Sequence, residues 1–512
     1  MQLPNTLSAL IGAGHDAATA IHAPGGAPLS YAALRGLVAQ SIATLNGLGI
    51  GRGDRVAIVL PNGPEMATSF VAIAAGCASC PLNPAYRAEE FEFYLSDLKA
   101  RALVVERGST SASVEVARKL GVRIIELVPG SEGSGSFTLH APDGAAGTAT
   151  AHGGPAQAGD VALILHTSGT TSRPKIVPLT QSNVCASAYN IVATLQLTAA
   201  DRALNIMPLF HIHGLIAGTL APLAAGSTIF CTPGFNALKF FQWMAECKPT
   251  WYTAVPTMHQ TILARAAQNR EVIAAHPLRF LRSSSSSIPP QVIAELEAVF
   301  NAPLIESYGM TEASHQMASN PLPPAVRKPG TVGVAAGPEI AIMDDRGALL
   351  PRGATGEIVI RGPNVTLGYE NNPKANGEAF TNGWFRTGDQ GTLDADGYLS
   401  ITGRLKEIIN RGGEKISPIE VDTILMDHPA VEQVVTFAIP HHMLGEDVGA
   451  VVVLRAGQEA TERELRDFVA KHAADFKVPR KVVFVSEIPK GATGKLQRIG
   501  LAAKLGLAEA KA

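Results

Sequence analysis

The chain contains 512 residues, of which 46% are hydrophobic and 17% charged, a composition typical of a globular protein with ample material for a core. Its 42 Lys and Arg residues against 44 Asp and Glu residues leave a net charge of −2 with no basic block, which argues against a nucleic-acid-binding or membrane-surface protein. At about 100–200 residues per domain, the length predicts several domains or subdomains.

The amino-terminal stretch, MQLPNTLSALIGAGHD, has neither a basic segment nor a clear apolar one, so we expect no secretion signal. The chain ends in EAKA, which predicts no targeting tail. The longest uncharged run, 214–238, is interrupted by Pro222 and Pro233 and reads as a buried helix followed by a strand rather than a membrane span. We therefore expect a soluble protein that binds no membrane and no nucleic acid.

Cysteines are few and odd in number: Cys77, Cys80, Cys185, Cys231 and Cys247. Such a set argues against a disulfide framework and fits a reducing, cytoplasmic environment. The first two form a CxxC pair without a second Cys pair or a His pair, so a small-residue core helix that enters a strand is favoured over a metal or redox site.

Through residue 320 helical and β-rich segments alternate. The stretch 31–49 has helical spacing and ends in Gly, and short runs such as RVAIVLP, ALVVE, VALIL and PLIESY are apolar on both faces. This alternation predicts an α/β fold with mostly parallel, covered sheets. Residues 129–159 are rich in Gly, Ser, Ala and Pro, which predicts a connector.

A polar loop follows the run VALIL. LHTSGTTSRPKIVPLT, residues 165–180, offers small hydroxyl residues, Gly and two cations, a composition that suits a loop around a polyanion. It is not a Walker A loop, because Pro174 precedes Lys175 and Ile176 follows it. The alternative is a flexible surface turn with two solvated cations.

The sequence pattern changes after about residue 330, where short strands joined by tight turns replace the alternation of helices and strands. GTVGVA, EIAIMDDRGALL and GEIVIRG read as strands joined by tight turns, which predicts an antiparallel β subdomain over about 330–404. A small α+β domain follows, and in it Thr461 and Glu464 form a capping box. We expect an amino-terminal domain over 1–404 and a mobile carboxy-terminal domain over 405–512.

Five motifs stand in a fixed order: TSGTTSRPK, YGMTE at 308–312, WFRTGD at 384–389, GRLKEIINRGGEKISPIEVD at 403–422 and PKGATGKLQR at 489–498. In this order they resemble the acyl-adenylate-forming superfamily of acyl-CoA synthetases, luciferases and adenylation domains, over nearly the whole chain. LHTSGTTSRPK, PLFHIHG, TWYTAVPT, MTEASHQMASNPLP and INRGGEKISPIEVD further resemble its oxalate–CoA ligase branch.

The resemblance implies a reaction in two steps. A carboxylate attacks the α-phosphate of ATP to give an acyl-adenylate and pyrophosphate, and the thiolate of coenzyme A then displaces AMP. No enzyme nucleophile is needed, so cations, Mg²⁺ and backbone donors suffice. Small-molecule carboxylate, ATP and coenzyme A are the expected partners, and the oligomeric state stays open.

The resemblance also assigns residues to the nucleotide. The loop would cover the β- and γ-phosphates, Thr311 would contact the α-phosphate, and Glu312 would hold Mg²⁺. Tyr308 would stack on adenine, and Asp389 with Arg404 would contact the ribose; a core tyrosine, a turn and an ordinary domain border are the alternatives. The full nucleotide set is Thr167, Ser168, Gly169, Thr170, Thr171, Lys175, Ser285, Tyr308, Gly309, Thr311, Asp389 and Arg404.

The tail domain carries the remaining family roles. Lys495 would bridge the substrate carboxylate and the α-phosphate as a catalytic residue. Lys406 occupies the hinge position, about which the tail would rotate between the two steps. The coenzyme A candidates, for which solvated surface positions are the alternative, are Arg411, Gly412, Gly413 and Lys415.

The serine run 283–287 replaces small apolar residues of most relatives, and three histidines lie in the neighbouring motifs. A pocket this polar predicts a short, doubly charged acid, and oxalate is our hypothesis. The substrate candidates are His213, Ser285, Ser287 and His315, and His211 is a further catalytic candidate; ordinary packing, and serines lining adenine, are the alternatives.

Ile176 departs from the family pattern, which has Gly after the loop lysine. A β-branched residue disfavours positive φ, so either this position is extended or the loop is altered. Three rival functions stay open: a ligase for malonate or a short to medium monocarboxylate, an enzyme that hands the adenylate to a carrier or to oxygen, and a non-catalytic nucleotide-binding module.

Overall fold

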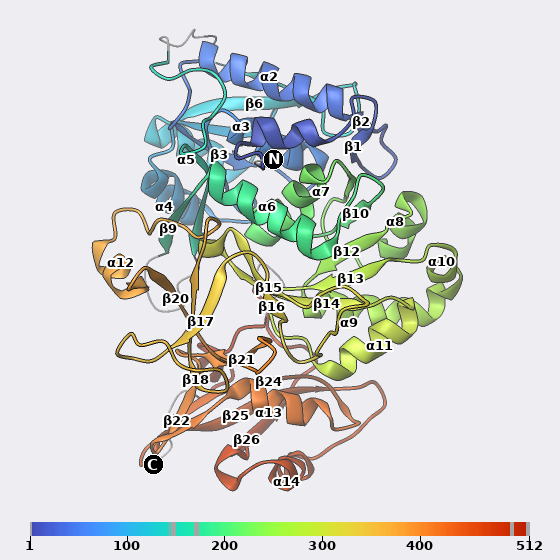
Figure 1. Cartoon of the computed structure of the whole chain (residues 1–512), viewed down its shortest axis with the longest axis vertical. Coiled ribbons are helices and arrows are strands. Elements are labelled where there is room, and N and C mark those ends of the chain that lie inside the picture. The colour runs from blue at the N-terminus through green and yellow to red at the C-terminus, as the bar shows by residue number, and fades with distance from the viewer. Residues whose placement is uncertain (1–2, 143, 145–149, 168–173, 492–495, 508–512) are drawn as a thin grey trace.

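The computed structural model describes residues 3–142, 144, 150–167, 174–491 and 496–507, and these form four β-sheets (Figure 1). The prediction of an α/β fold with mostly parallel sheets, an antiparallel β part and a small α+β tail is confirmed.

The largest sheet has nine strands and is parallel in its middle. The short apolar runs of the sequence form these strands, because burial on both faces favours continuous apolar segments. In spatial order they are β16 (Val334–Ala335), β15 (His315–Ser319), β14 (Leu304–Met310), β13 (Phe280–Ser283), β12 (Trp251–Ala254), β10 (Arg202–Asn205), β11 (Thr228–Cys231), β1 (Thr19–His22) and β2 (Leu29–Ser30).

The second sheet has seven strands, with an antiparallel strand at each edge. Its order is β7 (Phe137–His140), β6 (Arg123–Pro129), β5 (Ala102–Glu106), β3 (Arg55–Val59), β4 (Ala78–Pro81), β8 (Val161–Thr167) and β9 (Lys175–Thr180). The segment 129–159, which we expected to be only a connector, thus contributes β7. Its FTLH sequence alternates buried and exposed residues, as an edge strand does.

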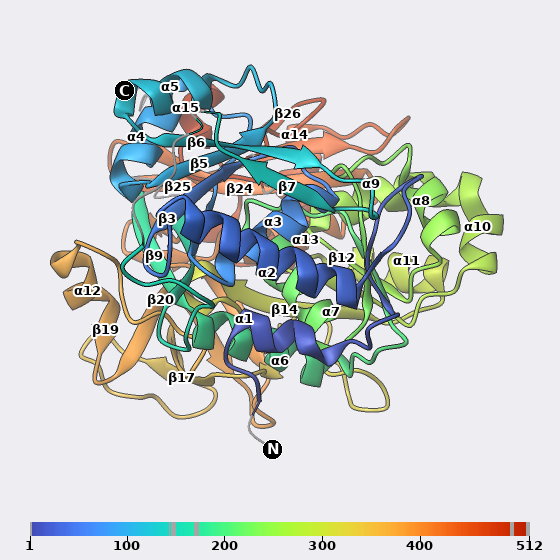
Figure 2. The same ribbon diagram turned by 90° about the horizontal axis from the view of Figure 1, so that it is seen from above.

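Helices separate and cover the two sheets. Helix α6 (Gln181–Leu195) contacts β8 and β9 of one sheet and β15 of the other. In Figure 2, α2 (Tyr31–Gly47) lies across the molecule and contacts β2 and β7. Further helices between the sheets or on their outer faces are α1 (Leu7–Leu10), η1 (Ile11–Ala13), α3 (Pro64–Ala74), α4 (Ala88–Leu98), α5 (Ala112–Leu120), η2 (His213–Leu220), α7 (Ala221–Ala224), α8 (Phe240–Cys247), α9 (Pro256–Ala266), η3 (Ala267–Asn269), α10 (Arg270–Ala275) and α11 (Pro290–Phe300).

The third sheet is antiparallel throughout. It consists of β17 (Glu339–Met343), β18 (Thr355–Arg361), β19 (Phe380–Thr381), β20 (Trp384–Leu393) and β21 (Leu399–Arg404), with α12 (Pro373–Ala379) beside it. The run GTVGVA, which we expected to open this subdomain, instead forms β16 and pairs with β15 at the edge of the nine-stranded sheet.

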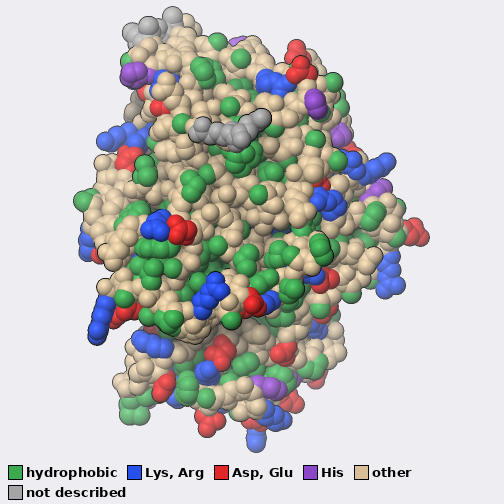
Figure 3. All heavy atoms as spheres, in the orientation of Figure 1, with side chains coloured by type: hydrophobic (Ala, Val, Ile, Leu, Met, Phe, Trp, Pro, Cys, Tyr) green, Lys and Arg blue, Asp and Glu red, His purple; other side chains and the backbone are tan. Residues whose placement is uncertain are grey.

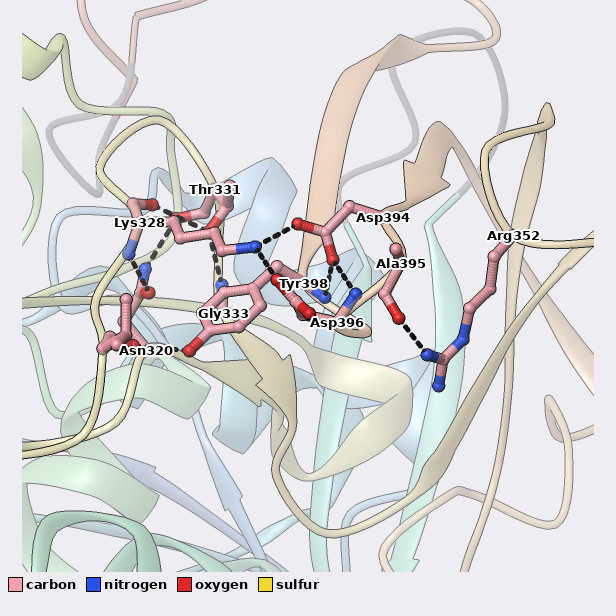
Figure 4. A network of polar contacts seen from close by, with 10 residues as sticks. Asn320, Lys328, Thr331, Gly333, Arg352, Asp394, Ala395, Asp396 and Tyr398 are labelled. Carbon is pink, nitrogen blue, oxygen red and sulfur yellow. Dashed lines mark hydrogen bonds and ion pairs between the residues drawn. The ribbon is translucent and has the colours of Figure 1, made fainter.

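A polar network holds the turn between β20 and β21 against the loop before β16 (Figure 4). Lys328 Nζ donates to Asp394 at 2.6 Å and to Asp396 at 2.7 Å, and it lies 4.4 Å from the centre of the Tyr398 ring. The Tyr398 hydroxyl donates to the carbonyl oxygen of Val326.

The carboxy-terminal residues form the fourth sheet, drawn orange to red at the bottom of Figure 1. Its strands are β22 (Ile409–Arg411), β23 (Glu414–Ile416), β24 (Val431–His441), β25 (Gly445–Leu454) and β26 (Lys481–Phe484), accompanied by α13 (Pro418–Met426), α14 (Glu462–His472), η5 (Asp475–Lys477) and α15 (Leu501–Lys504). The predicted capping box of Thr461 and Glu464 is present at the start of α14.

Surface and core agree with the composition. On the face in Figure 3, acidic and basic side chains are interspersed, without a large field of one sign. All five cysteines are free and buried. In the described part of the chain, no helix has both the length and the apolar character needed to cross a bilayer.

Candidate active site

Polar segments follow the ends of strands in both large sheets. β8 ends at Thr167, β13 at Ser283 and β14 at Met310. The turn η4 (Thr311–Ala313), directly after β14, contacts β9 of the seven-stranded sheet. Carboxyl ends of parallel strands are the usual place for ligand sites in α/β proteins, so these segments form a candidate site between the sheets.

The two ends of the predicted phosphate loop lie opposite each other. Thr167 and Lys175 are paired residues of the antiparallel strands β8 and β9. The Oγ1 atom of Thr167 is buried and has no hydrogen-bond partner among the described residues, so it can still bind a ligand. Ser168, Gly169, Thr170, Thr171 and the catalytic candidate Lys495 lie outside the described residues.

Ile176 occupies an ordinary strand position. It belongs to β9, is 5% exposed and packs in the apolar cluster that contains Ile164. Its carbonyl oxygen accepts a hydrogen bond from the backbone of Glu370 at 3.1 Å. Of the two alternatives, the extended one therefore holds, because a β-branched residue suits a buried strand.

Glu312 and Lys175 both contact Tyr369. The Tyr369 hydroxyl donates to Glu312 Oε1 at 2.7 Å, while Lys175 Nζ lies 3.9 Å from the centre of the Tyr369 ring. Burial raises the pKa of the Glu312 carboxyl, and burial lowers the pKa of the Lys175 ammonium. Thr311 begins the same turn and stands next to Glu312.

The donor set is compatible with Mg²⁺. Glu312 is a buried carboxylate with one oxygen already oriented by a hydroxyl, and Mg²⁺ is commonly held by one or two carboxylates together with substrate phosphates. No group of three or more acidic, His or Cys side chains that could hold a metal occurs among the described residues.

Tyr308, Asp389 and Arg404 come together as predicted neighbours. Asp389 and Arg404 are directly opposite in β20 and β21, and Arg404 Nε donates to Asp389 Oδ1 at 3.0 Å. The Tyr308 hydroxyl donates to the other carboxylate oxygen. Burial, reinforced by Asp389, raises the pKa of Tyr308, so the phenol stays protonated.

An arginine that we did not single out lies at the centre of the predicted acyl pocket. Arg282, in β13, is fully buried. Its Nη1 lies 3.2 Å from His213 Nε2, and its Nη2 lies 3.1 Å from His315 Nε2. The two imidazole rings stack with their centres 4.8 Å apart.

Arg282 determines which ring nitrogen of each histidine carries the proton. A guanidinium only donates, so each Nε2 must accept and each neutral ring carries its proton on Nδ1. His213 Nδ1 then donates to Ser285 Oγ at 3.1 Å. The remaining partners of the guanidinium, Thr253 and Gln316, are uncharged as well.

Arg282 therefore has no carboxylate counter-ion among the described residues. Its Nε atom has no hydrogen-bond partner there, and burial lowers the pKa of the guanidinium. A buried charge without a counter-ion is costly, and such a cost is tolerated where a ligand supplies the partner.

Backbone strain surrounds this cluster. Ser285, Ser314 and His315 adopt positive φ angles of 76°, 49° and 97°. Such angles are unusual for residues other than Gly and concentrate at functional sites. Gly309 passes so close to His315 that a Cβ atom on it would lie 1.8 Å from the His315 carbonyl oxygen, so only Gly fits there.

Two predicted residues lie apart from the Arg282 contacts. Ser287 is exposed, and the hydrogen bonds of the cluster among described residues reach Ser285 instead. His211 is half-buried before η2, and its Nδ1 accepts from the His213 backbone at 3.4 Å, so it orients the turn that carries His213.

The coenzyme A candidates lie in the hairpin of β22 and β23. Gly412 and Gly413 have φ angles of 59° and 100°, as a tight turn requires. Lys415 is exposed, but Arg411 Nε donates to the buried Asp447 at 2.8 Å, so its charge is partly engaged within the tail. The hinge candidate Lys406 is exposed in the turn between β21 and β22.

Sequence reasoning missed Arg282 and Tyr369. The signal for Arg282 was a charged residue inside RFLRS, a run expected to be covered on both faces. Tyr369 stands in LGYENN, where nothing local distinguishes it, and its partners Lys175 and Glu312 are far away in the chain.

Comparisons with known proteins agree with this geometry. Two family models match, AMP-binding enzyme over residues 11–370 and AMP-binding enzyme C-terminal domain over residues 420–495. The chain is 46% identical over 476 residues to the oxalate–CoA ligase of Arabidopsis thaliana, covering 92% of each. It is 44% identical over 471 residues to the oxalate–CoA ligase of Saccharomyces cerevisiae, covering 87% of this chain and 86% of that relative.

A solved structure has the same fold. ATP-bound MatB from Rhodopseudomonas palustris superposes with a TM-score of 0.86 at 31% identity, covering 97% of each chain.

Proposed function

Because the chain belongs to the AMP-binding enzyme family, we propose that it activates oxalate with ATP and transfers the acid to coenzyme A, giving oxalyl-CoA, AMP and pyrophosphate. Two relatives at 44–46% identity are named for this reaction and support an acyl-CoA ligase activity. The choice of oxalate rests on more than their names.

The uncompensated charge of Arg282 is the observation that carries the substrate proposal. The Arg282 guanidinium lies within hydrogen-bond distance of His213 and His315, and His213 contacts Ser285. A substrate with a single carboxylate would lose that negative charge when the adenylate forms, and the Arg282 guanidinium would then have no counter-ion. The second carboxylate of a short diacid would compensate that charge through the imidazole and hydroxyl donors.

In the first step a carboxylate oxygen of oxalate attacks the α-phosphorus of ATP, and pyrophosphate leaves. Lys175, which lies over the Tyr369 ring, would neutralise the phosphates, and Thr167 Oγ1, which has no partner among the described residues, would donate to them. Asp389, held by Tyr308 and Arg404, has lone pairs left to accept from the ribose hydroxyls. When bound at Glu312, Mg²⁺ would neutralise phosphate charge.

In the second step the coenzyme A thiolate attacks the acyl carbon, and AMP leaves. Lys495 and the Gly412–Gly413 turn belong to a carboxy-terminal domain, proposed as 405–512, that rotates about Lys406 relative to 1–404. The proposed compartment is the cytoplasm, which is supported by five cysteines that are free and buried.

A substrate panel tests the proposal. Pyrophosphate release and thioester formation are measured with oxalate, malonate, acetate and hexanoate, each with and without coenzyme A. We expect the highest kcat/KM for oxalate and thioester only when coenzyme A is present. A preference for malonate would replace the acid but keep the diacid, whereas a preference for acetate or hexanoate would contradict the role of Arg282.

A further inference from the structure

The segment 364–370, which follows β18, connects the two sides of the phosphate site. On one side, Asn364 Nδ2 donates to the carbonyl oxygens of Ala313 and Gln316, at 2.8 and 2.9 Å. On the other side, Thr366 Oγ1 donates to the Pro178 carbonyl oxygen at 2.9 Å. The segment thereby ties the turn after β14 to strand β9.

Further bonds join the same two sides. The Thr366 backbone donates to the Glu312 carbonyl oxygen at 2.7 Å, and the Glu370 backbone donates to Ile176. Glu370 is in turn bound by both carboxylate oxygens to Arg55 in β3, at 2.7 and 2.6 Å. The backbone around position 369 is thus held from both ends.

The Tyr369 side chain occupies the middle of this connection. It is 6% exposed, its ring lies under the Lys175 ammonium, and its hydroxyl is bonded to the Glu312 carboxylate. The two charges attract each other across the tyrosine, but no direct ion pair of Lys175 or of Glu312 occurs among the described residues.

Two opposite charges in a buried site attract each other strongly, since the local dielectric is low. If they paired directly, the lysine would be less available to phosphate and the carboxylate less available to a metal ion. The aromatic ring satisfies the ammonium through a cation–π contact and the hydroxyl satisfies the carboxylate, so neither is lost to the other.

We propose that Tyr369 is a positioning residue that keeps Lys175 and Glu312 apart, so that the lysine stays available for ATP phosphates and the carboxylate for Mg²⁺. The inference rests on the proposed function for the identity of these ligands. It assigns the role to a side chain that need not touch the reacting atoms.

Binding measurements separate the two halves of this role. ATP affinity is measured by titration calorimetry in EDTA and again in Mg²⁺. Tyr369→Phe keeps the ring and loses the hydroxyl, so metal-free ATP binding should stay the same while the gain in affinity from Mg²⁺ falls roughly 10-fold, the scale of a hydrogen bond to a charged group. Tyr369→Leu removes the ring as well, so metal-free binding should also weaken.

A second substitution tests the separation itself. If Lys175 is captured by Glu312 in Tyr369→Leu, adding Glu312→Gln should restore metal-free ATP binding toward the wild-type value. Glu312→Gln alone removes a negative charge beside the phosphate site and should itself strengthen metal-free binding, so the rescue is the gain in the Tyr369→Leu background beyond the gain in the wild-type background. A tyrosine that only supports the fold would give no such rescue.

Tyr398→Phe is the matched control, because Tyr398 is also buried, also lies under a lysine and also donates a hydrogen bond. It should bind ATP as the wild type does with and without Mg²⁺. The proposal is overturned if Tyr369→Phe retains the full Mg²⁺ gain, or if Tyr369→Leu binds metal-free ATP normally or is not rescued.

Failure of the proposed function gives a different result. If the wild-type protein binds ATP but forms no oxalyl-CoA, the substrate is wrong while these binding tests still apply. If Tyr369→Leu does not fold, as judged by thermal unfolding, Tyr369→Phe decides alone.

Discussion

Two lysines of this molecule stack on buried tyrosines, and their acidic neighbours are arranged in opposite ways. Lys328 lies over Tyr398 and pairs directly with Asp394 and Asp396, at 2.6 and 2.7 Å (Figure 4). Lys175 lies over Tyr369, and the acid, Glu312, is bonded to the hydroxyl of that tyrosine instead. The first arrangement closes the ion pair and the second keeps it open.

The difference shows how a binding site can be recognised among similar contacts. The closed pair lies at the surface, with Asp396 70% exposed, where ion pairs contribute little. In the open pair Glu312 is buried and Lys175 is half-buried, and leaving such charges apart is unfavourable unless a ligand completes them. Arg282, with no carboxylate partner among the described residues, follows the second pattern.

Replacing each lysine in turn should give the largest difference in activity between the two arrangements. Lys175→Met should lower kcat/KM for ATP roughly 100- to 1,000-fold, the usual loss when one charge-stabilising group is removed from an active site. Lys328→Met removes a chemically similar contact at the surface and should leave kcat/KM within about twofold. Steady-state pyrophosphate release measures both, and equal losses would contradict the distinction.

The buried arginine extends the comparison to the acid. Arg282→Met should lower kcat/KM for oxalate roughly 30- to 1,000-fold, as expected when one member of a desolvated charge pair is removed. The low activity with acetate and the KM for ATP should change little, because neither uses the second carboxylate. The preference for oxalate over acetate should therefore shrink.

Stability gives an independent control for the same variant. A buried charge without a counter-ion is replaced by an apolar side chain of similar length, so the melting temperature should not fall. A variant that melts far below the wild type would instead indicate that Arg282 mainly supports the fold.

The sequence predicted those site residues that local motifs carry. Lys175, Glu312 and Asp389 each stand in one of the short motifs that carry the family resemblance, and the structure brings the first two into contact with Tyr369. The parallel sheets and the antiparallel part were readable from runs that are apolar on both faces or joined by tight turns.

Contacts between distant segments were not readable. Arg282, in β13, meets His213 across 69 residues and His315 across 33 residues. His213 belongs to η2 and His315 to β15, neither of which pairs with β13, so the packing of η2 against the sheet brings the three together. Which strands become neighbours depends on tertiary packing, because the preference of a segment for a strand is strongly dependent on its context. For the same reason, β16 was expected in the antiparallel subdomain, whereas it joins the edge of the nine-stranded sheet.

A buried acid, Glu306, lies near the closed pair and should make the stability of the protein depend on pH. Burial raises the pKa of Glu306 to about 8, and the carboxyl accepts from the backbone of Gly330, two residues after Lys328. The folded state therefore holds a proton that the unfolded state loses above its ordinary value of 4.5. Stability from this group is complete below that value and is lost as the pH rises through about 8.

Glu306→Gln carries no charge at any pH and keeps an acceptor for Gly330. We expect the variant to melt about 2–5 °C above the wild type at pH 8.5 and to match it near pH 4.5, since the amide at position 306 does not titrate while the carboxyl does. Differential scanning calorimetry at the two pH values measures this. A constant offset at both would mean that packing, not ionisation, accounts for the change.

The smallest effects should come from within the closed pair, where its two acids are unequal. Asp394 Oδ1 also accepts from the backbones of Asp396 and Tyr398, at 2.9 and 2.8 Å, so it shapes the turn between β20 and β21. Among the described residues, the exposed Asp396 carboxylate bonds only to Lys328, and Asp396→Asn leaves Asp394 as a partner for the lysine. We expect Asp396→Asn to lower the melting temperature by less than about 1 °C, with the difference vanishing in high salt.

Asp394→Asn should lower the melting temperature more than Asp396→Asn does. The additional loss should persist in high salt, because the amide replaces a charged acceptor of two backbone bonds. Equal, salt-sensitive shifts would mean that the turn is held by charge alone.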